Sequence, residues 1–597
     1  MPSFLQRSAD LRAGGGPLRL GDETVAWVIL AIGYFWLLLW VAAAAAAVLS
    51  GAVRPPFSPT APFLAFTQLA NPSASWGRRV AGPWLYWGST VALLIVGLCA
   101  PWGLWLLRKR TSGSPSDDLS RILGVATAPD VKRAAGRRWL LHRAGSLRPS
   151  LSDPAPHDVG YRLGRSRGQD CFCSVEDSIV ILGPPRSGKG LHFVIPSILD
   201  APGAVITTST RPDNLTATLR AREAIGPVAV FDPQRLAPGI PSSTRWSPIR
   251  GCENPQTALL RAKALAVGAA GGTVDSNFWQ ASSEQVVRCL LHAAALGGRT
   301  PTDLYRWSLS AVQAREAVAI LATDPRAALS WDQALESIVT ADPRQRDSVW
   351  AMVSIVFAAL ADPRVMEALS PDAGQEFDPE RFLRFKGTVY LLGTASGAAA
   401  TAGLVGAFVE DVVGAARRLA AASAGARLDP PLSLLLDEAA NYPLPSLTSL
   451  MSEGGGTGIS TMVVLQSLAQ ARAVWGEHAA SAVWDAAIVK IVLGGGSTAR
   501  DLDDLSRLIG QRDEAQSSTS TSGDGRRSVS TSTVRVPIME PHRLRTLPFG
   551  TAVLLLRSAK PIVLSMTPWI DRRDGDELRA RQTELEGVIQ RAYAQGG

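Results

Sequence analysis

A glycine-rich loop with one lysine, at residues 183–190, constrains the fold of this chain more than any other feature. It follows an apolar run at 178–182 that is typical of a short buried strand. The loop reads Gly183-Pro184-Pro185-Arg186-Ser187-Gly188-Lys189-Gly190. This spacing lets backbone N–H groups curl around a phosphate while the lysine reaches the outer phosphates. The sequence therefore predicts an α/β fold with a nucleotide phosphate site at the end of a strand.

One position of the loop departs from the usual pattern. Gly190 stands where a Ser or Thr hydroxyl normally contacts magnesium. The chain has only seven lysines among its 60 basic residues, yet one of them is Lys189. Because the compact lysine ammonium and the arginine fork are not interchangeable beside phosphates, this choice favours a phosphate site. From the loop alone, an ordinary glycine-rich turn after a strand remains the alternative.

Two further apolar runs end in polar residues that suit nucleotide hydrolysis. Residues 432–438 read as a strand that ends in Asp437 and Glu438, and a second strand over 462–465 ends at Gln466. Hydrolysis needs a carboxylate for the metal and a group that orients the attacking water. We expect Asp437 to bind the metal, Glu438 to activate water and Gln466 to sense the terminal phosphate. Taken singly, each of these could be a turn or a strand-end cap.

Strand-like runs occur in two separate parts of the chain, at 177–252 and 386–570, and predict one parallel-sheet domain. Between them, at 253–385, apolar residues recur every three or four positions, which predicts an all-helical insertion. Composition assigns the remaining segments as a basic stem at 111–176, a mobile Ser/Thr-rich surface loop at 514–534 and a charged C-terminal helix at 571–597.

The N-terminal 110 residues are predicted to be a membrane anchor. Two runs without charged residues are long enough to cross a hydrocarbon core, so we expect transmembrane helices at about 25–49 and 84–107. The basic residues 108–110 after the second run place both termini in the cytoplasm. A pair of buried core helices is the alternative. The expected protein is thus a multi-pass membrane protein with its N-terminus and its nucleotide-binding domain in the cytoplasm.

The charge of the chain is unevenly distributed. Residues 1–150 carry 16 basic and 6 acidic side chains, whereas the remainder carries 44 and 46. The positive balance therefore belongs to the region beside the predicted membrane segments. It does not by itself indicate that the larger part binds nucleic acid.

Several motifs together resemble the coupling proteins of type IV secretion systems, which feed DNA into conjugation channels. The motifs are Ser187–Gly190, Thr208–Asp213, Phe231–Pro233, Trp246–Pro248, Phe278-Trp279, Leu436–Asn441, Leu465–Ser467 and Leu493–Gly495. The chain resembles the TraG/TraD-like DNA-transfer ATPases of actinobacterial type. Loops in this family often read Ser-Gly-Lys-Gly, so the resemblance accommodates Gly190.

The resemblance implies a RecA-like P-loop NTPase domain with an all-helical insertion, preceded by two transmembrane helices. It implies ATP and Mg as cofactors and a homo-hexameric ring. It also implies partners in DNA with a bound relaxase, the channel proteins and the inner membrane. The expected function is a membrane-anchored ATPase that couples ATP hydrolysis to delivery of DNA, or a DNA–protein complex, into a secretion channel. In this site Lys189, Glu438 and Gln466 are catalytic, residues 183–190 bind the nucleotide and Asp437 binds the metal.

Other functions remain open at this stage. The nearly balanced charge of residues 151–597 is compatible with a coupling receptor for protein effectors that has little DNA involvement. A chromosome-segregation-type DNA translocase is another alternative, as is a scaffold with a degenerate site. Residues 451–456 lack the arginine that family members often carry there. The residues expected to take the place of this arginine are Lys490, Arg500 and Arg507.

Overall fold

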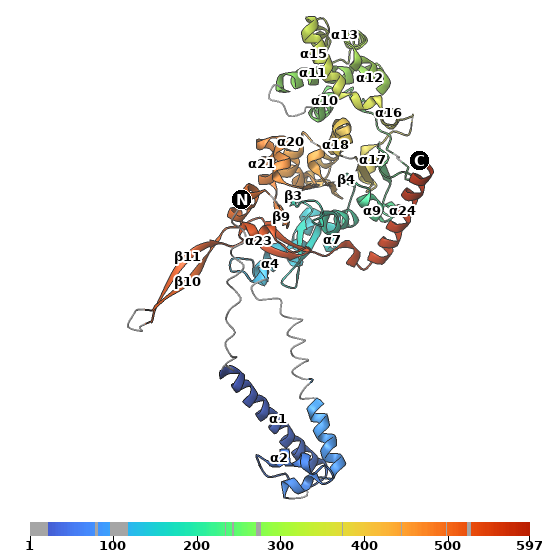
Figure 1. Cartoon of the computed structure of the whole chain (residues 1–597). Coiled ribbons are helices and arrows are strands. Elements are labelled where there is room, and N and C mark those ends of the chain that lie inside the picture. The colour runs from blue at the N-terminus through green and yellow to red at the C-terminus, as the bar shows by residue number, and fades with distance from the viewer. Residues whose placement is uncertain are drawn as a thin grey trace, which may run out of the picture. The chain divides into compact units, whose positions relative to one another are not determined.

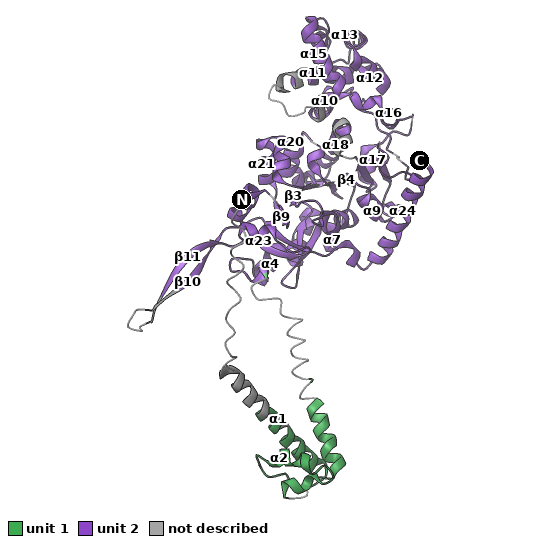
Figure 2. Cartoon of the chain, viewed as in Figure 1, with its two compact units in different colours: residues 1–118 green, residues 119–597 purple. Residues whose placement is uncertain are grey.

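The structure, a computed structural model, falls into two compact units, residues 1–118 and residues 119–597 (Figure 2). It describes residues 22–77, 81–95, 99, 118–232, 234–241, 244–269, 276–372, 374–393, 395–442, 444–496, 498–521 and 527–596.

The first unit is helical. Its elements are α1 (Asp22–Leu49), α2 (Ala61–Leu64), two 3₁₀ turns (Ala65–Thr67 and Pro72–Trp76) and a helix over 83–95. The small side chains of Ala43 and Ala47 on α1 are buried together with Trp76 and Tyr86. Trp76 donates a hydrogen bond from Nε1 to the Tyr86 hydroxyl at 3.3 Å.

The structure of this unit contradicts the localisation predicted from the sequence. Within the described residues, the structure holds no helix whose length and apolar character suffice for crossing a membrane. The prediction of a multi-pass membrane protein with spans at 25–49 and 84–107 is therefore wrong for the described part of the chain. An uncharged run is not in itself a span, since part of this run packs as small alanines against neighbouring turns. Residues 96–98 and 100–107 of the second run lie outside the described residues.

The second unit is built on an eleven-stranded mixed sheet in the order β2-β1-β13-β12-β9-β3-β8-β7-β4-β6-β5 (Figure 1). Neighbours from β9 to β5 run parallel, and β12, β13, β1 and β2 pair antiparallel beside them. The strands are β1 (Gly160–Ser166), β2 (Gln169–Ser174), β3 (Ile179–Leu182), β4 (Val205–Ser209), β5 (Val228–Phe231), β6 (Thr388–Leu392), β7 (Leu432–Leu436), β8 (Ile459–Leu465), β9 (Val489–Leu493), β12 (Thr551–Leu556) and β13 (Ile562–Ser565).

The central strands consist mainly of apolar residues, with a few buried Ser and Thr, because both faces of the sheet are covered. On β3, Ile179 and Ile181 face one buried cluster, and Val180 and Leu182 face the other. Every residue of β3, β4, β6, β7 and β8 is buried. Continuous apolar runs, rather than alternating ones, are therefore what the chain needs at these positions.

Helices cover the sheet, and the regular elements described between β5 and β6 are all helical. That segment holds α10 (Pro255–Ala269), α11 (Ser276–Leu296), α12 (Pro301–Leu309), α13 (Arg315–Thr323), α14 (Trp331–Val339), α15 (Pro343–Val356), α16 (Pro363–Leu369) and α17 (Pro379–Arg384). The other helices of this unit include α4 (Ala128–Ala135), α5 (Arg137–His142), α6 (Ala144–Leu147), α7 (Pro156–Val159), α8 (Ile195–Asp200), α9 (Asp213–Glu223), α18 (Ala395–Ala421), α19 (Leu447–Glu453), α20 (Leu468–Trp475), α21 (Glu477–Ala486), α22 (Ala499–Ile509), α23 (Pro541–Arg545) and α24 (Gly575–Gly596).

A buried ion pair connects the helical segment to α18. Arg261 on α10 lies 2.7 Å from the Asp411 carboxylate on α18, and the two side chains are 2% and 7% exposed. Asp411 also accepts a hydrogen bond from Trp246 Nε1 at 3.0 Å. Arg261 donates further to the Pro248 carbonyl oxygen at 2.9 Å. The partly exposed Arg250 guanidinium also lies 3.5 Å from the Asp411 carboxylate. The buried pair is thus supported by further hydrogen bonds and a second cation, which is the condition under which a buried pair is tolerated.

Two segments differ from their sequence-based interpretation. Within the predicted stem at 111–176, β1 and β2 join the main sheet, with Tyr161 and Leu163 of β1 buried. Within the predicted mobile loop at 514–534, β10 (Gln511–Thr521) pairs with β11 (Arg527–Pro537) as an antiparallel ribbon that extends from the sheet domain (Figure 1). Ser and Thr suit both a loop and a solvated ribbon, so composition alone did not separate the two.

Removing one partner of the Arg261–Asp411 pair tests how the helical segment is held. Asp411→Ala leaves the Arg261 guanidinium buried without its counter-charge, so we expect a loss of about 3–5 kcal/mol in the free energy of unfolding. Asp347→Ala, which removes a carboxylate that is 69% exposed beside Arg346, is the control and should change stability by less than about 0.5 kcal/mol. Urea denaturation of the full chain measures both, and equal effects would contradict this assignment.

Candidate functional site

The glycine-rich loop follows β3 and is held in a tight curl. Gly183 donates its backbone N–H to the Leu465 carbonyl oxygen of β8 at 3.1 Å. A Cβ at Gly183 would lie 2.7 Å from Ser187 Oγ and 2.8 Å from Leu493 Cδ1, so only glycine permits this approach. Gly188 has a φ of 90°, a backbone conformation that favours glycine. The chain then enters a π-helical turn, Gly190–Val194, and continues into α8.

Lys189 folds back over the loop that precedes it. Its Nζ donates a hydrogen bond to the Gly183 carbonyl oxygen at 2.7 Å, and the side chain is buried. Burial lowers the pKa of Lys189, while the charges of Asp437 and Glu438 raise it. The ammonium therefore lies within electrostatic range of both predicted carboxylates. The hydrogen-bond acceptor of its Nζ is a neutral carbonyl oxygen, which an anionic ligand can replace.

Asp437 stands directly after β7, one strand beyond β8. Its carbonyl oxygen accepts a hydrogen bond from Thr208 Oγ1 at 2.8 Å, and its Oδ1 accepts one from the Glu438 N–H at 3.1 Å. The pKa of Asp437 is raised to about 6, mainly by burial; the charge of Lys189 lowers it, the charge of Glu438 raises it, and hydrogen bonds from the Glu438 N–H and the Asn214 side chain lower it. A carboxyl group that is costly to ionise alone is suited to a cation, because a bound cation favours the charged form.

Glu438 is held in a fixed orientation by two amides. Gln466 donates from Nε2 to Glu438 Oε1 at 3.1 Å, and Asn441 donates from Nδ2 to Oε2 at 3.2 Å. Glu438 also has a φ of 51°, which is uncommon for a residue with a side chain. Such backbone conformations persist where the surrounding structure enforces them, and they cluster at functional sites. The predicted pair of Glu438 and Gln466 is thus brought into direct contact.

Three residues near this site were missed by the sequence analysis. Asn214, at the start of α9, faces Asp437, and its buried Nδ2 makes no hydrogen bond of standard geometry. His192 is buried in the π-helical turn, and its ring lies 5.4 Å from that of Phe549. Phe549 is 68% exposed and lies close to Gly188. Asn214 directly follows the motif Thr208–Asp213, which was the available signal, whereas nothing in the sequence links Phe549 to the loop.

The predicted substitutes for a missing arginine lie in different places. Lys490 belongs to the start of β9, where its Nζ donates to the Ala487 carbonyl oxygen at the far end of the strand from the loop. Arg500 is on α22, which follows β9, and pairs with Glu477 at 3.3 Å. Arg507 is exposed two turns further along the same helix. Lys490 therefore lies away from the edge of the sheet that carries the site.

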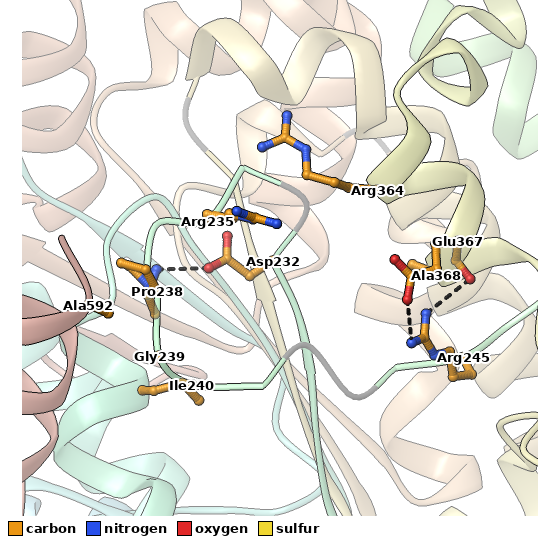
Figure 3. Close-up of a pocket in the computed structure, with 11 residues that line it drawn as sticks. Asp232, Arg235, Pro238, Gly239, Ile240, Arg245, Arg364, Glu367, Ala368 and Ala592 are labelled. Atoms are coloured by element: carbon orange, nitrogen blue, oxygen red, sulfur yellow. Dashed lines mark hydrogen bonds and ion pairs between the residues drawn. The ribbon is translucent and has the colours of Figure 1, made fainter. Parts of the chain in front are cut away.

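A separate cavity of about 400 Å³ lies beyond the carboxyl end of β5 (Figure 3). The Asp232 carboxylate there accepts backbone N–H groups from Leu236 and Ala237 at 2.9 and 2.8 Å. Across the cavity, Arg245 donates to the Glu367 carboxylate at 2.8 Å. These charged groups already have partners within the chain. The cavity includes none of the site residues predicted from the sequence.

The residues present fit a nucleotide with its magnesium ion. The loop supplies a curl of backbone ahead of a helical turn, and Lys189 supplies a positive charge beside it. Asp437 supplies a carboxylate, and the amide of Asn214 beside it supplies a further polar group. Carboxylate and amide oxygens are ordinary ligands of magnesium and of its bound water.

Comparisons with known proteins agree with the motif resemblance. Residues 431–549 match the family model described as the TraM recognition site of TraD and TraG. Among curated proteins, no sequence matches this chain. The matched residues include Asp437, Glu438 and Gln466, and they continue through the β10–β11 ribbon.

Solved structures of the conjugative coupling protein TrwB have a similar fold. The unbound monoclinic form of TrwBdeltaN70 is 18% identical, with a TM-score of 0.53, and the match covers 71% of this chain and 91% of that one. TrwB with the ATP analogue ADPNP and TrwB with ADP and Mg²⁺ each match at 18% identity and a TM-score of 0.51, over 71% of this chain and 92% of theirs. Together with the family model, these matches confirm the resemblance to TraG/TraD-like coupling proteins.

The two glycines that flank Lys189 differ in how much they tolerate a side chain. Gly188→Ala forces a Cβ to 2.8 Å from His192 at a φ of 90°, so we expect it to destabilise the chain by about 1–2 kcal/mol. Gly190→Ala meets only Asn214 Oδ1, at 3.8 Å, and should be neutral or slightly stabilising. Urea denaturation compares the two variants, and an equal loss at both positions would show that the loop is not held as described.

Proposed function

We propose that this chain is an ATPase that couples hydrolysis of magnesium-bound ATP to the delivery of DNA, or of a DNA–protein complex, into a conjugation channel. The observation that carries the proposal is the convergence of Lys189, Asp437, Glu438 and Gln466 at one edge of a parallel sheet. Open α/β sheets bind their ligands at the carboxyl ends of the strands, where these four residues lie.

The roles of the residues follow from their contacts. Lys189 exchanges the Gly183 carbonyl oxygen for a phosphate oxygen and neutralises charge on the nucleotide. Asp437 holds the magnesium ion, which stabilises charge on the transferring phosphate. Glu438 orients the attacking water, and its contact with Gln466 connects the state of the nucleotide to the strand β8.

The comparisons support the choice of ligand and of partner. TrwB has been solved with ADPNP and with ADP and Mg²⁺, on a fold that this chain shares. The match to the TraM recognition site of TraD and TraG supports a protein partner bound to the DNA. We include a homo-hexameric ring in the proposal, because a site of this class is usually completed by a neighbouring subunit.

Two substitutions separate binding from hydrolysis in the proposed site. Lys189→Ala should lose most nucleotide binding, since it removes the only lysine in the loop. Glu438→Gln should still bind nucleotide but lose about 10²–10⁴-fold in ATP turnover, because the amide cannot accept a proton from water. The measurements are ATP turnover and the Kd of a fluorescent ATP analogue on the purified full chain, each with and without single- and double-stranded DNA.

Control variants and DNA stimulation make the outcome decisive. Glu336→Gln changes an exposed glutamate on α14 and should leave turnover unchanged. Stimulation of wild-type turnover by DNA supports the DNA-coupled function. Turnover without stimulation favours the receptor for protein effectors, which the almost balanced charge of residues 151–597 allows. A chain with no turnover, or one in which Glu438→Gln retains full turnover, contradicts the proposed ATPase.

A further inference from the structure

The absence of a side chain at residue 190 leaves a space beside the loop. A Cβ at Gly190 would have one neighbouring atom within 4 Å, namely Asn214 Oδ1 at 3.8 Å. Gly190 is not among the residues with positive φ, so the backbone does not require glycine there. Neither sterics nor backbone conformation therefore explains this glycine. The place where a Ser or Thr hydroxyl would stand is bordered instead by the carboxamide of Asn214.

Asn214 is itself an exception among buried polar side chains. It is only 3% exposed, and its Nδ2 makes no hydrogen bond of standard geometry, although the side chain interacts with the Asp437 carboxylate. Buried amides with such incomplete hydrogen bonding are few in folded proteins. The backbone around Asn214 is well anchored, since its carbonyl oxygen accepts a hydrogen bond from Thr218 Oγ1 at 2.6 Å. The side chain is thus held beside Asp437 without a full set of hydrogen bonds.

The sheet places this amide between the loop and the acidic strand. Asn214 follows β4, and β4 is paired in parallel with β7, which carries Asp437. The side chain of Asn214 interacts with the Asp437 carboxylate, and its Oδ1 borders the space at Gly190. A cation held by Asp437 next to the phosphates would therefore lie within the region that Asn214 borders.

From this juxtaposition we propose that Asn214 takes the part of the missing loop hydroxyl and positions the magnesium ion that accompanies the nucleotide. The inference rests on the proposed function, because it concerns the same nucleotide site. Amide carbonyl oxygens are suitable partners for magnesium or for its bound water. Asn214 is a positioning residue, and Gly190 is compatible with a magnesium-dependent site because α9 supplies the polar group that the loop lacks.

The test measures how much magnesium strengthens nucleotide binding, which does not depend on turnover. The readout is the Kd of the full chain for a fluorescent ADP analogue in Mg²⁺, compared with its Kd in EDTA. We expect Asn214→Ala to reduce this magnesium-dependent gain by about ten-fold, within the range seen when groups that support a metal site are removed. The Kd in EDTA should change little.

A second substitution distinguishes positioning from a structural role. Adding Gly190→Ser to Asn214→Ala places a hydroxyl in the vacant space, and it should restore most of the magnesium-dependent gain. Asn254→Ala is the matched control, because it removes an exposed amide just before α10, whose Oδ1 accepts a hydrogen bond from the Gln256 N–H at 2.8 Å, outside the site. It should leave the ratio of the two Kd values unchanged.

Each outcome bears on the inference separately from the proposed function. If the wild-type chain gains from magnesium and Asn214→Ala keeps the full gain, the inference is overturned and the proposed function stands. If Asn214→Ala weakens binding equally in Mg²⁺ and EDTA, without rescue by Gly190→Ser, the residue is structural and the inference fails. If the wild-type chain shows no magnesium-dependent binding, the proposed function and the inference both fail.

Discussion

The parallel pairing of β3, β8, β7 and β4 is the constraint on which the site depends. Ile179 is in register with Met462, Leu435 with Met462, and Val205 with Ser433. Because the strands point the same way, their carboxyl ends meet at one edge of the sheet. Lys189, Asp437 and Gln466 are separated by up to 277 positions in the chain, yet Asp437 and Gln466 directly follow β7 and β8, and Lys189 lies in the loop that follows β3. The site therefore exists only when all of the strands are paired in this register.

Buried polar contacts fix the elements that surround this edge. Arg222 on α9 is fully buried and donates to Thr388 Oγ1 at 2.8 Å and to the carbonyl oxygens of Ala201 and Gly203 at 3.1 and 2.8 Å. These contacts tie α9 to the chain before β4 and to β6. Since α9 begins with the residues beside the site, Arg222 indirectly fixes the place of Asn214. The Arg261–Asp411 pair serves the helical segment in the same way, by joining α10 to α18.

Gly190 has one interpretation from the sequence motif and another from its three-dimensional surroundings. In the sequence it is a missing hydroxyl, and only the resemblance to a family accommodates it. In the structure it is a space with a defined neighbour, bordered by the amide of Asn214, which also interacts with Asp437. Asn214 is 24 positions away in sequence, at the start of a different helix. The sequence of a loop cannot predict a side chain that another strand–helix unit places beside it.

The sequence by itself determined the glycine-rich loop after a strand, the acidic strand end and the alternation of strands and helices, since each depends on residues adjacent in the chain. The apolar runs at 178–182, 388–392 and 462–465 correspond to β3, β6 and the end of β8. The sequence did not predict β1 and β2 as sheet strands, or the ribbon at 511–537. Their short or polar patterns suit loops equally well, and only pairing with another strand distinguishes the two. Tertiary structure alone decided the contact of Gln466 with Glu438, the place of Phe549 beside the loop and the approach of Asn214 to Gly190. These contacts are set by strand order, which no local pattern encodes.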